Sequence, residues 1–537
     1  MLIKNLAVNL SDNRELIEIV ADHLKISPKK ISNIKILRKA IDARRYHGSE
    51  IKFIYNIDVE LIQNVKSNIQ VEDLKNNSAF CILHSTLNNP IVVGFGPAGM
   101  FAALTLAKAG LEPLVFERGA DVDTRQSEVE KFFKSGILNL NTNVQFGEGG
   151  AGTFSDGKLT TRVNDELISE VIATFIEAGA PEEIRYLQKP HIGTDNLRNV
   201  VKNIRQKIIE LGGKVFFNAQ ITDVEIKAGK IQAVIVNNEQ RHETNSLFLA
   251  IGHSARDTYE MLLNSGVEME AKAFAIGVRV EHPQEFIDKS QYGIDAGNPK
   301  LPVADYFLTF NPNKNNSSFN IPNSSLNRGV YTFCMCPGGQ VVAAASEIGG
   351  VVTNGMSNFK RDSGIANAAV LSTVSPTDFT DFGRDALCGV RFQRKYESLT
   401  FELGGKNYCA PVQTVGDFLN GRSGSTQFLT SPTYPIGFKV VDLHHCLPKF
   451  VTSTLEAALI NFNKKIPDFA ADDVVMTGIE TRTSAPCRLL RNKEDFQSVN
   501  VKGLYPIGEG AGYSGGIMSS AIDGIKSVKH FLYDLNS

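Results

Sequence analysis

One stretch of the chain combines an apolar strand, a glycine-rich turn and an apolar helix. Residues 90–99 read PIVVGFGPAG, which places three glycines at the G-x-G-x-x-G spacing. An apolar helix over 98–109 and a second strand over 113–117 follow, and that strand ends in Glu117. These glycines let the backbone close on a pyrophosphate at the N-terminus of a helix, and the acid can bind ribose hydroxyls. The order of elements therefore predicts a dinucleotide-binding unit.

Glu117 also restricts which dinucleotide this turn can bind. A carboxylate accepts hydrogen bonds from ribose hydroxyls and repels a 2′-phosphate, so NADP is not expected here. The competing interpretation is a solvated acid at a strand end. Two other glycine-rich stretches give weaker signals, because 147–152 lacks a following helix and 508–516 is too rich in glycine for a plain Rossmann turn.

A C-terminal segment favours FAD over NAD. A strand over 503–507 leads to Glu509, which is placed to bind the ribityl chain of an extended FAD. Gly515 and Gly516 let the helix that begins near Ile517 approach the flavin pyrimidine, where the helix dipole favours the negative charge of reduced flavin. A domain that binds only NAD needs no such return of the chain.

Composition excludes several classes of protein. A length of 537 residues suits two or three domains, and a net charge of −2 gives no bulk attraction to DNA or to membranes. The seven cysteines are scattered and odd in number, which indicates reduced thiols in a cytoplasm. No Cys/His set has the spacing of a zinc site, so no metal is expected. The polar N-terminus is not a signal peptide, and no apolar run is long enough to span a membrane.

Cys334 and Cys336 are the closely spaced pair among these cysteines. One interpretation is a redox dithiol beside a flavin. A single intervening residue would strain a disulfide, however, and the flanking residues 330–333 and 341–344 have the character of strands. Alternation along a strand directs both thiols to one face, so we favour the interpretation that they fill the core.

Changes in pattern divide the chain into three domains. Residues 1–88 predict a small α/β module, 89–265 and 475–537 together predict a discontinuous FAD-binding domain, and 266–474 predict a substrate domain inserted into it. The N-terminal module carries a basic run with few aromatic residues, so we favour a solvated face over an RNA or acidic-partner surface. The basic residues are Lys25, Lys29, Lys30, Lys35, Arg38, Lys39, Arg44 and Arg45.

Local patterns predict the elements around these motifs. We expect a loop over 121–125 ahead of a helix over 129–135. From 266 onward we expect short strands and loops that end in an amphipathic helix over 453–463. The other expected elements are helices over 16–24, 165–178 and 194–211 and strands over 34–37, 51–59, 214–217, 221–227, 231–236 and 246–251.

Several motifs together resemble those of the glutathione-reductase-type FAD fold. They are GFGPAG at 94–99 with Glu117 and Arg118, AIGHSARD at 250–257 and YPIGEGAGYSGG at 505–516. The resemblance implies an α/β fold in which a Rossmann-like FAD domain carries an inserted α+β domain. One departure is Glu509, which stands where the wider fold usually has Asp.

More narrowly, the chain is similar to a bacterial family of FAD-dependent dehydrogenases in which a small N-terminal domain precedes the FAD domain. The segments that resemble its signatures are FGEGGAGTFSDGKL at 146–159, CMCPGG at 334–339 and ETRTSAP at 480–486. By this resemblance, Gln145 and the loop 149–158 line the flavin, and Gln145 and Lys158 are the candidate catalytic residues. Ser155, Asp156 and Lys158 are polar contacts or proton donors on one interpretation, and merely close a glycine-rich turn on the other.

Further site residues follow from position. Arg125, beyond the second strand, is placed for a cofactor phosphate. His253 either orients the cofactor or satisfies local backbone, and the charged run Glu480, Arg482 and Arg488 suggests a substrate or nicotinamide phosphate site. The predicted cofactor-binding residues are Gly94, Phe95, Gly96, Pro97, Ala98, Gly99, Glu117, Arg118, Arg125, Gln145, Gly152, Ile221, Gly252, Gly508, Glu509, Gly515, Gly516 and Ile517.

The sequence therefore predicts a cytoplasmic FAD-dependent oxidoreductase, a dehydrogenase or reductase that moves electrons through flavin N5 to or from a small molecule. No second G-x-G-x-x-G motif occurs between 266 and 475. Electrons are therefore expected from the substrate itself, from transiently bound NADH or NADPH, or from an electron-transfer partner. The alternatives are a flavin-binding protein that contacts RNA or a partner through its basic N-terminal module, and a protein in which FAD is only structural.

Overall fold

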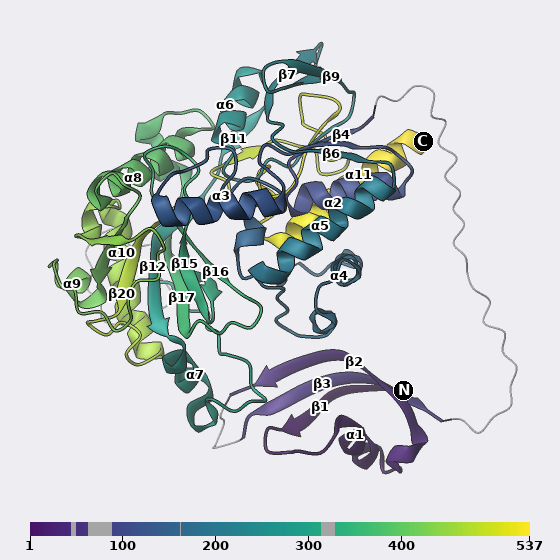
Figure 1. The fold of residues 1–537 in the computed structure, drawn as a ribbon, viewed down its shortest axis with the longest axis vertical. Helices are drawn as coiled ribbons and strands as arrows, with labels where there is room; N and C mark the ends of the chain where they lie inside the picture. The colour runs from purple at the N-terminus through teal and green to yellow at the C-terminus, as the bar shows by residue number, and fades with distance from the viewer. Residues whose placement is uncertain (45–49, 63–88, 162, 313–327) are drawn as a thin grey trace, which may run out of the picture.

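The computed structural model describes residues 1–44, 50–62, 89–161, 163–312 and 328–537. The fold is α/β, and Figure 1 shows a large body built on two sheets with a small separate sheet below it. Among the described residues, no helix is both long enough and apolar enough to cross a membrane. Arg45, Cys81 and the boundary expected at residue 88 lie outside the described residues.

A five-stranded parallel sheet forms the centre of the upper part of the body. Its order is β22-β10-β4-β5-β6, so a strand near the C-terminus lies beside strands from the first half of the chain. β4, β10 and β22 are buried throughout, because both faces of the sheet are covered. The strands are β4 (Ile91–Val93), β5 (Leu114–Phe116), β6 (Lys214–Phe216), β10 (Leu247–Leu249) and β22 (Leu504–Pro506).

Helices cover one face of this sheet, and a β-meander covers the other. α2 (Pro97–Lys108), α5 (Thr194–Glu210) and α11 (Ile517–Asn536) pack with Val92 and Phe248 into one core. The alternate strand residues face the meander, whose apolar side chains form a second core with them. The meander strands are β7 (Ile221–Lys227), β8 (Lys230–Val236) and β9 (Gln240–Glu243).

The larger sheet has seven strands in the order β13-β14-β17-β12-β20-β18-β19. β12 (Phe274–Pro283) and β17 (Ile365–Val374) pair antiparallel over ten residues each, where the sequence predicts only short strands. β20 (Val475–Glu480) pairs with β12 and β18, so the residues that begin at 475 join the seven-stranded sheet. The other strands are β13 (Thr309–Phe310), β14 (Val330–Cys336), β18 (Ala410–Thr414) and β19 (Phe438–Val440).

Smaller elements complete the body. α10 (Lys449–Lys465) packs on the seven-stranded sheet and is longer than the helix expected over 453–463. Two two-stranded sheets pair β11 (Met269–Ala271) with β21 (Cys487–Leu489) and β15 (Gly339–Ala343) with β16 (Thr353–Ser357). The other α-helices are α3 (Val122–Ser135), α4 (Leu167–Glu177), α6 (Arg256–Asn264), α7 (Gln284–Tyr292), α8 (Cys388–Gly404) and α9 (Val415–Leu419).

The loop expected over 121–125 is wrong. Helix α3 begins at Val122, and Asp121 caps it by accepting hydrogen bonds from the backbone N–H groups of Asp123 (3.1 Å) and Thr124 (3.3 Å). Asp is a preferred N-cap residue, and the polar first turn of this helix has no apolar periodicity by which it could be recognised.

The N-terminal module is a three-stranded antiparallel sheet with one helix. Its strands are β1 (Leu2–Asn9), β2 (Ile31–Asp42) and β3 (Lys52–Leu61), with β3 in the centre, and the helix expected over 16–24 is confirmed as α1 (Leu16–Leu24). The edge strand β2 bonds to the body through its backbone. Lys39 donates to the Tyr186 carbonyl at 2.7 Å and accepts from the Gln188 N–H at 2.9 Å.

The close packing of α11 on α2 makes Gly524 a sensitive position. A Cβ atom there would lie 2.3 Å from the carbonyl oxygen of Ala98. We expect Gly524→Val to lower the free energy of unfolding by about 2–3 kcal/mol, because the two helices must separate to accommodate the side chain. Denaturant unfolding measures the loss. In the control Gly329→Val the new Cβ meets no atom within 4 Å, and equal losses in the two variants would contradict the expectation.

Candidate functional site

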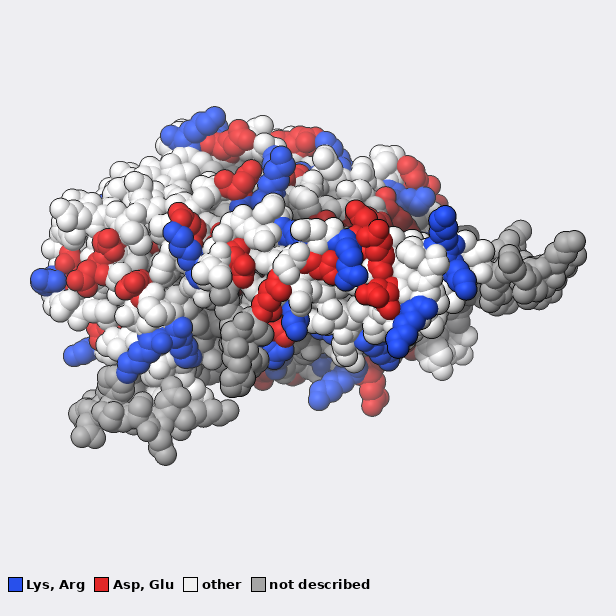
Figure 2. All heavy atoms as spheres, turned by 90° about the horizontal axis from the view of Figure 1, so that it is seen from below, with Lys and Arg blue, Asp and Glu red and all other residues white. Residues whose placement is uncertain are grey.

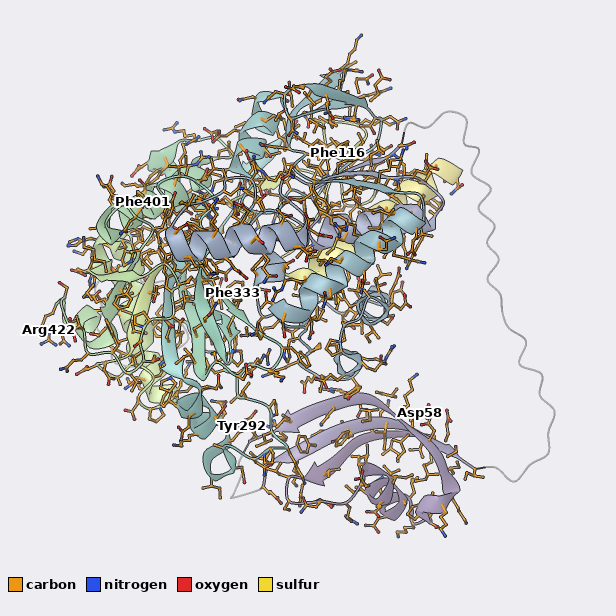
Figure 3. All side chains as sticks on the ribbon, in the orientation of Figure 1. Asp58, Phe116, Tyr292, Phe333, Phe401 and Arg422 are labelled. Carbon is orange, nitrogen blue, oxygen red and sulfur yellow. The ribbon has the colours of Figure 1, made fainter. Side chains whose placement is uncertain are left out.

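A cavity of about 390 Å³ lies where the parallel sheet meets the seven-stranded sheet. The carboxyl ends of β4, β5, β10 and β22 open onto it, which is where ligands of open α/β sheets bind. Figure 3 labels Phe116, from β5, and Phe333, from β14, on its two sides. The cavity therefore joins the predicted cofactor motif to the segment expected to select the substrate.

The glycine-rich turn forms one end of the cavity. Gly94 has a φ of +90°, and Gly96 is the N-cap of α2, so the free N–H groups of the helix face this end. The loop at 149–152 lies directly against the turn, because a Cβ on Gly150 would come within 2.9 Å of the Gly96 Cα. Two glycine backbones thus approach each other here, which suits the close passage of a pyrophosphate.

Glu117 lies next to the turn and is only 5% exposed. Its carboxylate accepts hydrogen bonds from the backbone N–H groups of Phe95 (2.8 Å), Gly119 (2.9 Å) and Gly147 (2.9 Å). A carboxylate can accept about four hydrogen bonds. Glu117 therefore retains acceptor capacity on the cavity side, which fits a ribose hydroxyl, and the solvated strand-end acid considered from the sequence does not describe it.

Arg118 supplies a cation to the same region. Its guanidinium pairs with Asp257, at 3.0 Å between Nη1 and Oδ1, and lies 4.2 Å from the centre of the Phe146 ring. Its Nε is buried and has no hydrogen-bond partner among the described residues. An unpaired buried donor on a cavity-lining cation fits an anionic or acceptor-rich ligand.

The C-terminal segment forms the opposite part of the cavity. β22 leads to Glu509, and Gly515, Gly516 and Ile517 bring the N-terminus of α11 to the cavity wall. Burial raises the pKa of Glu509 to about 7, and the charge of Lys272 opposes that effect. No side chain or N–H group among the described residues donates to this carboxylate, so it suits a ligand that brings its own hydroxyl groups.

Neutral polar groups line the middle of the cavity. Gln145 donates to the Ala344 carbonyl at 3.3 Å, and its Oε1 accepts from the Ser254 hydroxyl at 3.2 Å. Ser254 also contacts Nδ1 of His253 at 2.9 Å. Burial, reinforced by the charges of Arg482 and Arg256, lowers the pKa of His253 to about 3, so this imidazole is neutral at pH 7.

The wall from the seven-stranded sheet carries paired charges. Arg279 is fully buried and binds Glu480, at 3.1 Å between Nη2 and Oε1, and Asn354 at 3.2 Å. Burial raises the pKa of Glu480 to about 7, against the opposing charge of Arg279. Lys158 Nζ lies 3.6 Å from Asp156 and also donates to the Met335 carbonyl oxygen.

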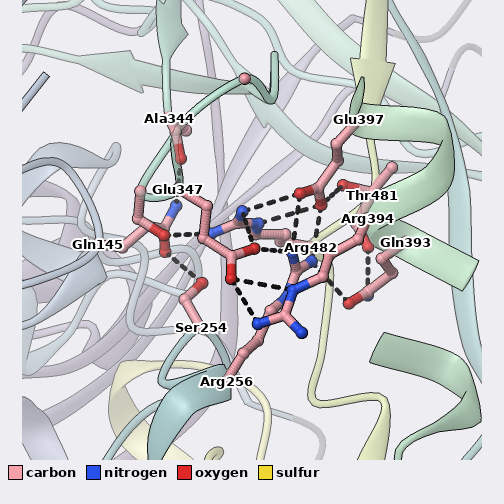
Figure 4. Close-up of polar contacts among 12 residues, drawn as sticks. Gln145, Ser254, Arg256, Ala344, Glu347, Gln393, Arg394, Glu397, Thr481 and Arg482 are labelled. Atoms are coloured by element: carbon pink, nitrogen blue, oxygen red, sulfur yellow. Dashed lines mark hydrogen bonds and ion pairs between the residues drawn. The ribbon is translucent and has the colours of Figure 1, made fainter. Parts of the chain in front are cut away.

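A buried ion network links the two sides of the cavity (Figure 4). Glu397, on α8, binds Arg256 of α6 at 2.7 and 2.8 Å and Arg482 at 2.9 and 3.1 Å. Burial alone would raise the pKa of Glu397, but the two guanidiniums outweigh it and hold the pKa well below its ordinary value. Thr481 adds a hydrogen bond of 2.6 Å, and Glu347 bridges Arg256 to Arg394.

The cavity brings most of the predicted cofactor residues together, with both candidate catalytic residues. Its lining includes Gly94, Phe95, Gly96, Pro97, Ala98, Glu117, Arg118, Gln145, Gly152, Lys158, Ile221, Gly252, Glu509, Gly515, Gly516 and Ile517. Gly99 and Gly508 lie behind it as packing positions. A Cβ on Gly99 would be 1.9 Å from the Gly94 carbonyl oxygen, and one on Gly508 would be 2.6 Å from the Ala98 Cβ.

Arg125 corrects the expectation of a phosphate contact. Its side chain is fully buried and does not line the cavity. Burial lowers its pKa to about 10, with Glu117 and Glu148 opposing that effect. Its guanidinium donates to the five carbonyl oxygens of Asn143, Val144, Gly147, Glu148 and Gly150.

Among the other charged and thiol groups, Arg488 and Cys334 are placed differently from the sequence-based expectation. Glu480 and Arg482 line the cavity, but Arg488 lies on β21 and pairs with Glu270 at 3.1 Å. Cys334 lines the cavity instead of filling the core, because β14 is bulged at this residue. Sequence patterns do not single out two further lining residues of this wall, Phe333 on β14 and Asn354 on β16, because the pairing of these strands places them.

Comparison with known proteins identifies the family. A family model described as "FAD-dependent protein, C-terminal domain-like" matches residues 273–483, and one described as "Domain of unknown function (DUF8436)" matches residues 3–60. An uncharacterised protein of Clostridium beijerinckii is 49% identical over 542 residues, which cover 99% of this chain and 98% of that protein. The chain belongs to this family of FAD-dependent proteins, and FAD is the cofactor.

Solved structures give weaker similarity. Halogenase PltM aligns with a TM-score of 0.37 and 10% identity, over 84% of this chain and 70% of that chain. CtdE in complex with FAD aligns with a TM-score of 0.31 and 11% identity, over 82% of this chain and 83% of that chain. At these scores the alignments define no reaction.

The ion network predicts a large effect of neutralising Glu397. We expect Glu397→Gln to lower the free energy of unfolding by about 3–5 kcal/mol, because two buried guanidiniums lose their counter-charge. Denaturant unfolding measures the change. Glu402→Gln, at an exposed position on the same helix α8, is the matched control. A Glu397→Gln variant as stable as this control would contradict the expectation that the two guanidiniums need this counter-charge.

Glu509 predicts a pH dependence of stability in protein freed of FAD. The folded state holds the Glu509 proton up to about pH 7, whereas the ordinary pKa is 4.5. As the pH rises from about 4.5 to about 7, the wild-type free energy of unfolding should therefore fall relative to that of Glu509→Gln. The fall is at most about 1.4 kcal/mol per pH unit. Unfolding curves across this range test the slope. The control Glu494→Gln, at an exposed position, should show the same pH dependence of the free energy of unfolding as wild type. If wild type and Glu509→Gln showed the same pH dependence, the expectation would be contradicted.

Proposed function

We propose that the protein is an FAD-dependent oxidoreductase, a dehydrogenase or reductase, whose cofactor lies extended in the cavity in a glutathione-reductase-type arrangement. The observation that carries this proposal is the convergence of both cofactor motifs on one cavity. Its opposite wall comes from the segment matched by the FAD-dependent family model. The parallel sheet, with its meander and returning strand β22, supports the arrangement.

The chain offers a distinct group for each part of the cofactor. The N-terminus of α2 suits the pyrophosphate, and Glu117 suits the adenosine ribose. Glu509 suits the ribityl hydroxyls, and the N-terminus of α11 suits the pyrimidine edge of the ring. The flavin supplies two-electron chemistry when it is bound.

The remaining lining residues suit the reactive end. Lys158 is a partly exposed cation on the cavity wall and can orient an anionic group or hold a proton for transfer. Gln145 is fixed by two hydrogen bonds and presents a neutral amide. The phenyl ring of Phe333 and the side chain of Arg482, which is paired with Glu397, help to exclude water from the cavity. The exclusion of water strengthens electrostatic interactions there.

We propose a small-molecule substrate, with electrons exchanged directly, through transiently bound NADH or NADPH, or with a partner protein. The RNA-binding alternative rests on the basic run of the N-terminal module. Figure 2, which views the molecule from below, shows basic and acidic side chains interspersed over this face, which favours a solvated surface.

Reduction of the bound flavin tests the proposal. Holoprotein mixed anaerobically with NADH, with NADPH or with candidate organic donors should lose its visible flavin absorption with at least one of them. Lys158→Met should slow this reduction by about 10²-fold or more while FAD stays bound. Lys202→Met, which removes a half-buried lysine that pairs with Asp123 and does not line the cavity, should leave the rate of flavin reduction unchanged.

A holoprotein whose flavin no such donor reduces would contradict the oxidoreductase proposal and favour a structural FAD. A Lys158→Met variant that reduces at the wild-type rate would exclude Lys158 from proton handling.

A further inference from the structure

Strand β14 carries a bulge at its C-terminal end. Its pairing with β17 shifts register between Phe333 and Cys336, and Cys334 adopts a left-handed φ of +42°. Side chains two positions apart on a regular strand are separated by roughly 6–7 Å. The bulge instead brings the Sγ atoms of Cys334 and Cys336 to 4.0 Å. Bulges and left-handed non-glycine residues concentrate at functional sites, where they redirect side chains.

The two thiols differ in their access to the cavity. Cys334 is partly exposed and lines the cavity, whereas Cys336 is fully buried. The hydrogen bond between the two sulfurs lowers the pKa of Cys334 and raises that of Cys336. The thiolate therefore forms first on the sulfur that faces the cavity, with a protonated partner behind it.

Charged groups around the pair support a thiolate. Arg279 donates to the Cys334 carbonyl oxygen at 3.3 Å, and Lys158 donates to the carbonyl oxygen of Met335, between the two cysteines. The carboxylates of Glu480 and Asp156 partner these two cations. The charges of Arg279 and Lys158 still lower the pKa of the Cys334 thiol, against the opposing effects of burial and of Asp156.

We propose that Cys334 and Cys336 form a redox-active dithiol that faces the FAD cavity, with Cys334 reacting first and Cys336 as its resolving partner. This inference rests on the proposed flavin site. Oxidation breaks the two S–H bonds and forms one S–S bond, and the two electrons and two protons pass to oxidised FAD, which becomes reduced. The reverse step returns them to the sulfurs. A disulfide across one intervening residue is strained and therefore easily reduced, which suits a pair that cycles.

An electron count on the holoprotein tests the proposal. The FAD-loaded protein is first oxidised with diamide, freed of excess reagent and titrated anaerobically with dithionite. Wild type should take up two electron pairs per flavin, one for the flavin and one for the disulfide. Cys336→Ser should take up one pair. Cys409→Ser, which removes another partly buried cysteine that does not line the cavity, should take up two.

Peptide mapping gives a second readout that does not depend on activity. After diamide treatment and alkylation, the peptide that contains Cys334 and Cys336 should be unalkylated and lighter by two hydrogens than its reduced form. Uptake of a single electron pair by wild type, with both cysteines alkylated, would overturn the proposal.

The outcomes separate this inference from the proposed function. Dithionite reduces bound flavin whatever the natural donor is, so the electron count does not depend on that donor. A flavin that no biological donor reduces would therefore contradict the oxidoreductase proposal and leave the electron count unchanged. Uptake of a single electron pair per flavin by wild type would contradict the dithiol proposal and leave the oxidoreductase proposal unaffected.

Discussion

The position of the cavity depends on one buried carboxylate. Glu397 binds guanidiniums from both sides of the cavity, Arg256 after the parallel sheet and Arg482 after the seven-stranded sheet. Burying three charges is costly, so the network adds little net stability compared with an apolar contact of the same size. Its bidentate geometry, however, fixes the orientation of the two sheets more precisely than apolar packing would. The walls of the proposed flavin site need such a fixed orientation, because catalysis is sensitive to displacements of about 1 Å.

Desolvation dominates the chemistry of the cavity. The pKa values of Glu480 and Glu509 are both raised to about 7, and that of His253 is lowered to about 3, in each case chiefly by burial. The two carboxyl groups, which would be fully charged in water, are thus partly protonated near pH 7, and the imidazole stays neutral well below that pH. Perturbed ionisable groups of this kind concentrate at functional sites. In such a setting a charge that forms on a bound ligand is weakly screened, and the few remaining cations, among them Lys158, have a correspondingly strong effect.

The sequence predicts the cavity wall on the side of the parallel sheet far better than the opposite wall. The turn at 94–99, Glu117 and the segment 508–517 are local patterns whose spacing reflects the physical needs of a dinucleotide. The opposite wall is set by pairing between β12, β17 and β20, which lie up to about 200 residues apart and leave no local periodicity to identify their partners. Cys334 illustrates the limit: strand alternation predicts a core position, and a single-residue bulge turns it toward the cavity.

Arg125 explains how a glycine-rich loop can form a precise wall. The loop 143–150 contains the left-handed glycines Gly147, Gly149 and Gly150, which leave its backbone with many accessible conformations when unfolded. Arg125 binds five of its carbonyl oxygens from within, and Glu117 and Asn143 bind N–H groups of the same loop. The entropic cost of ordering the loop is therefore met during folding and not when the cofactor binds. A phosphate contact by Arg125 would sacrifice this support, so its burial is consistent with binding through a preorganised loop.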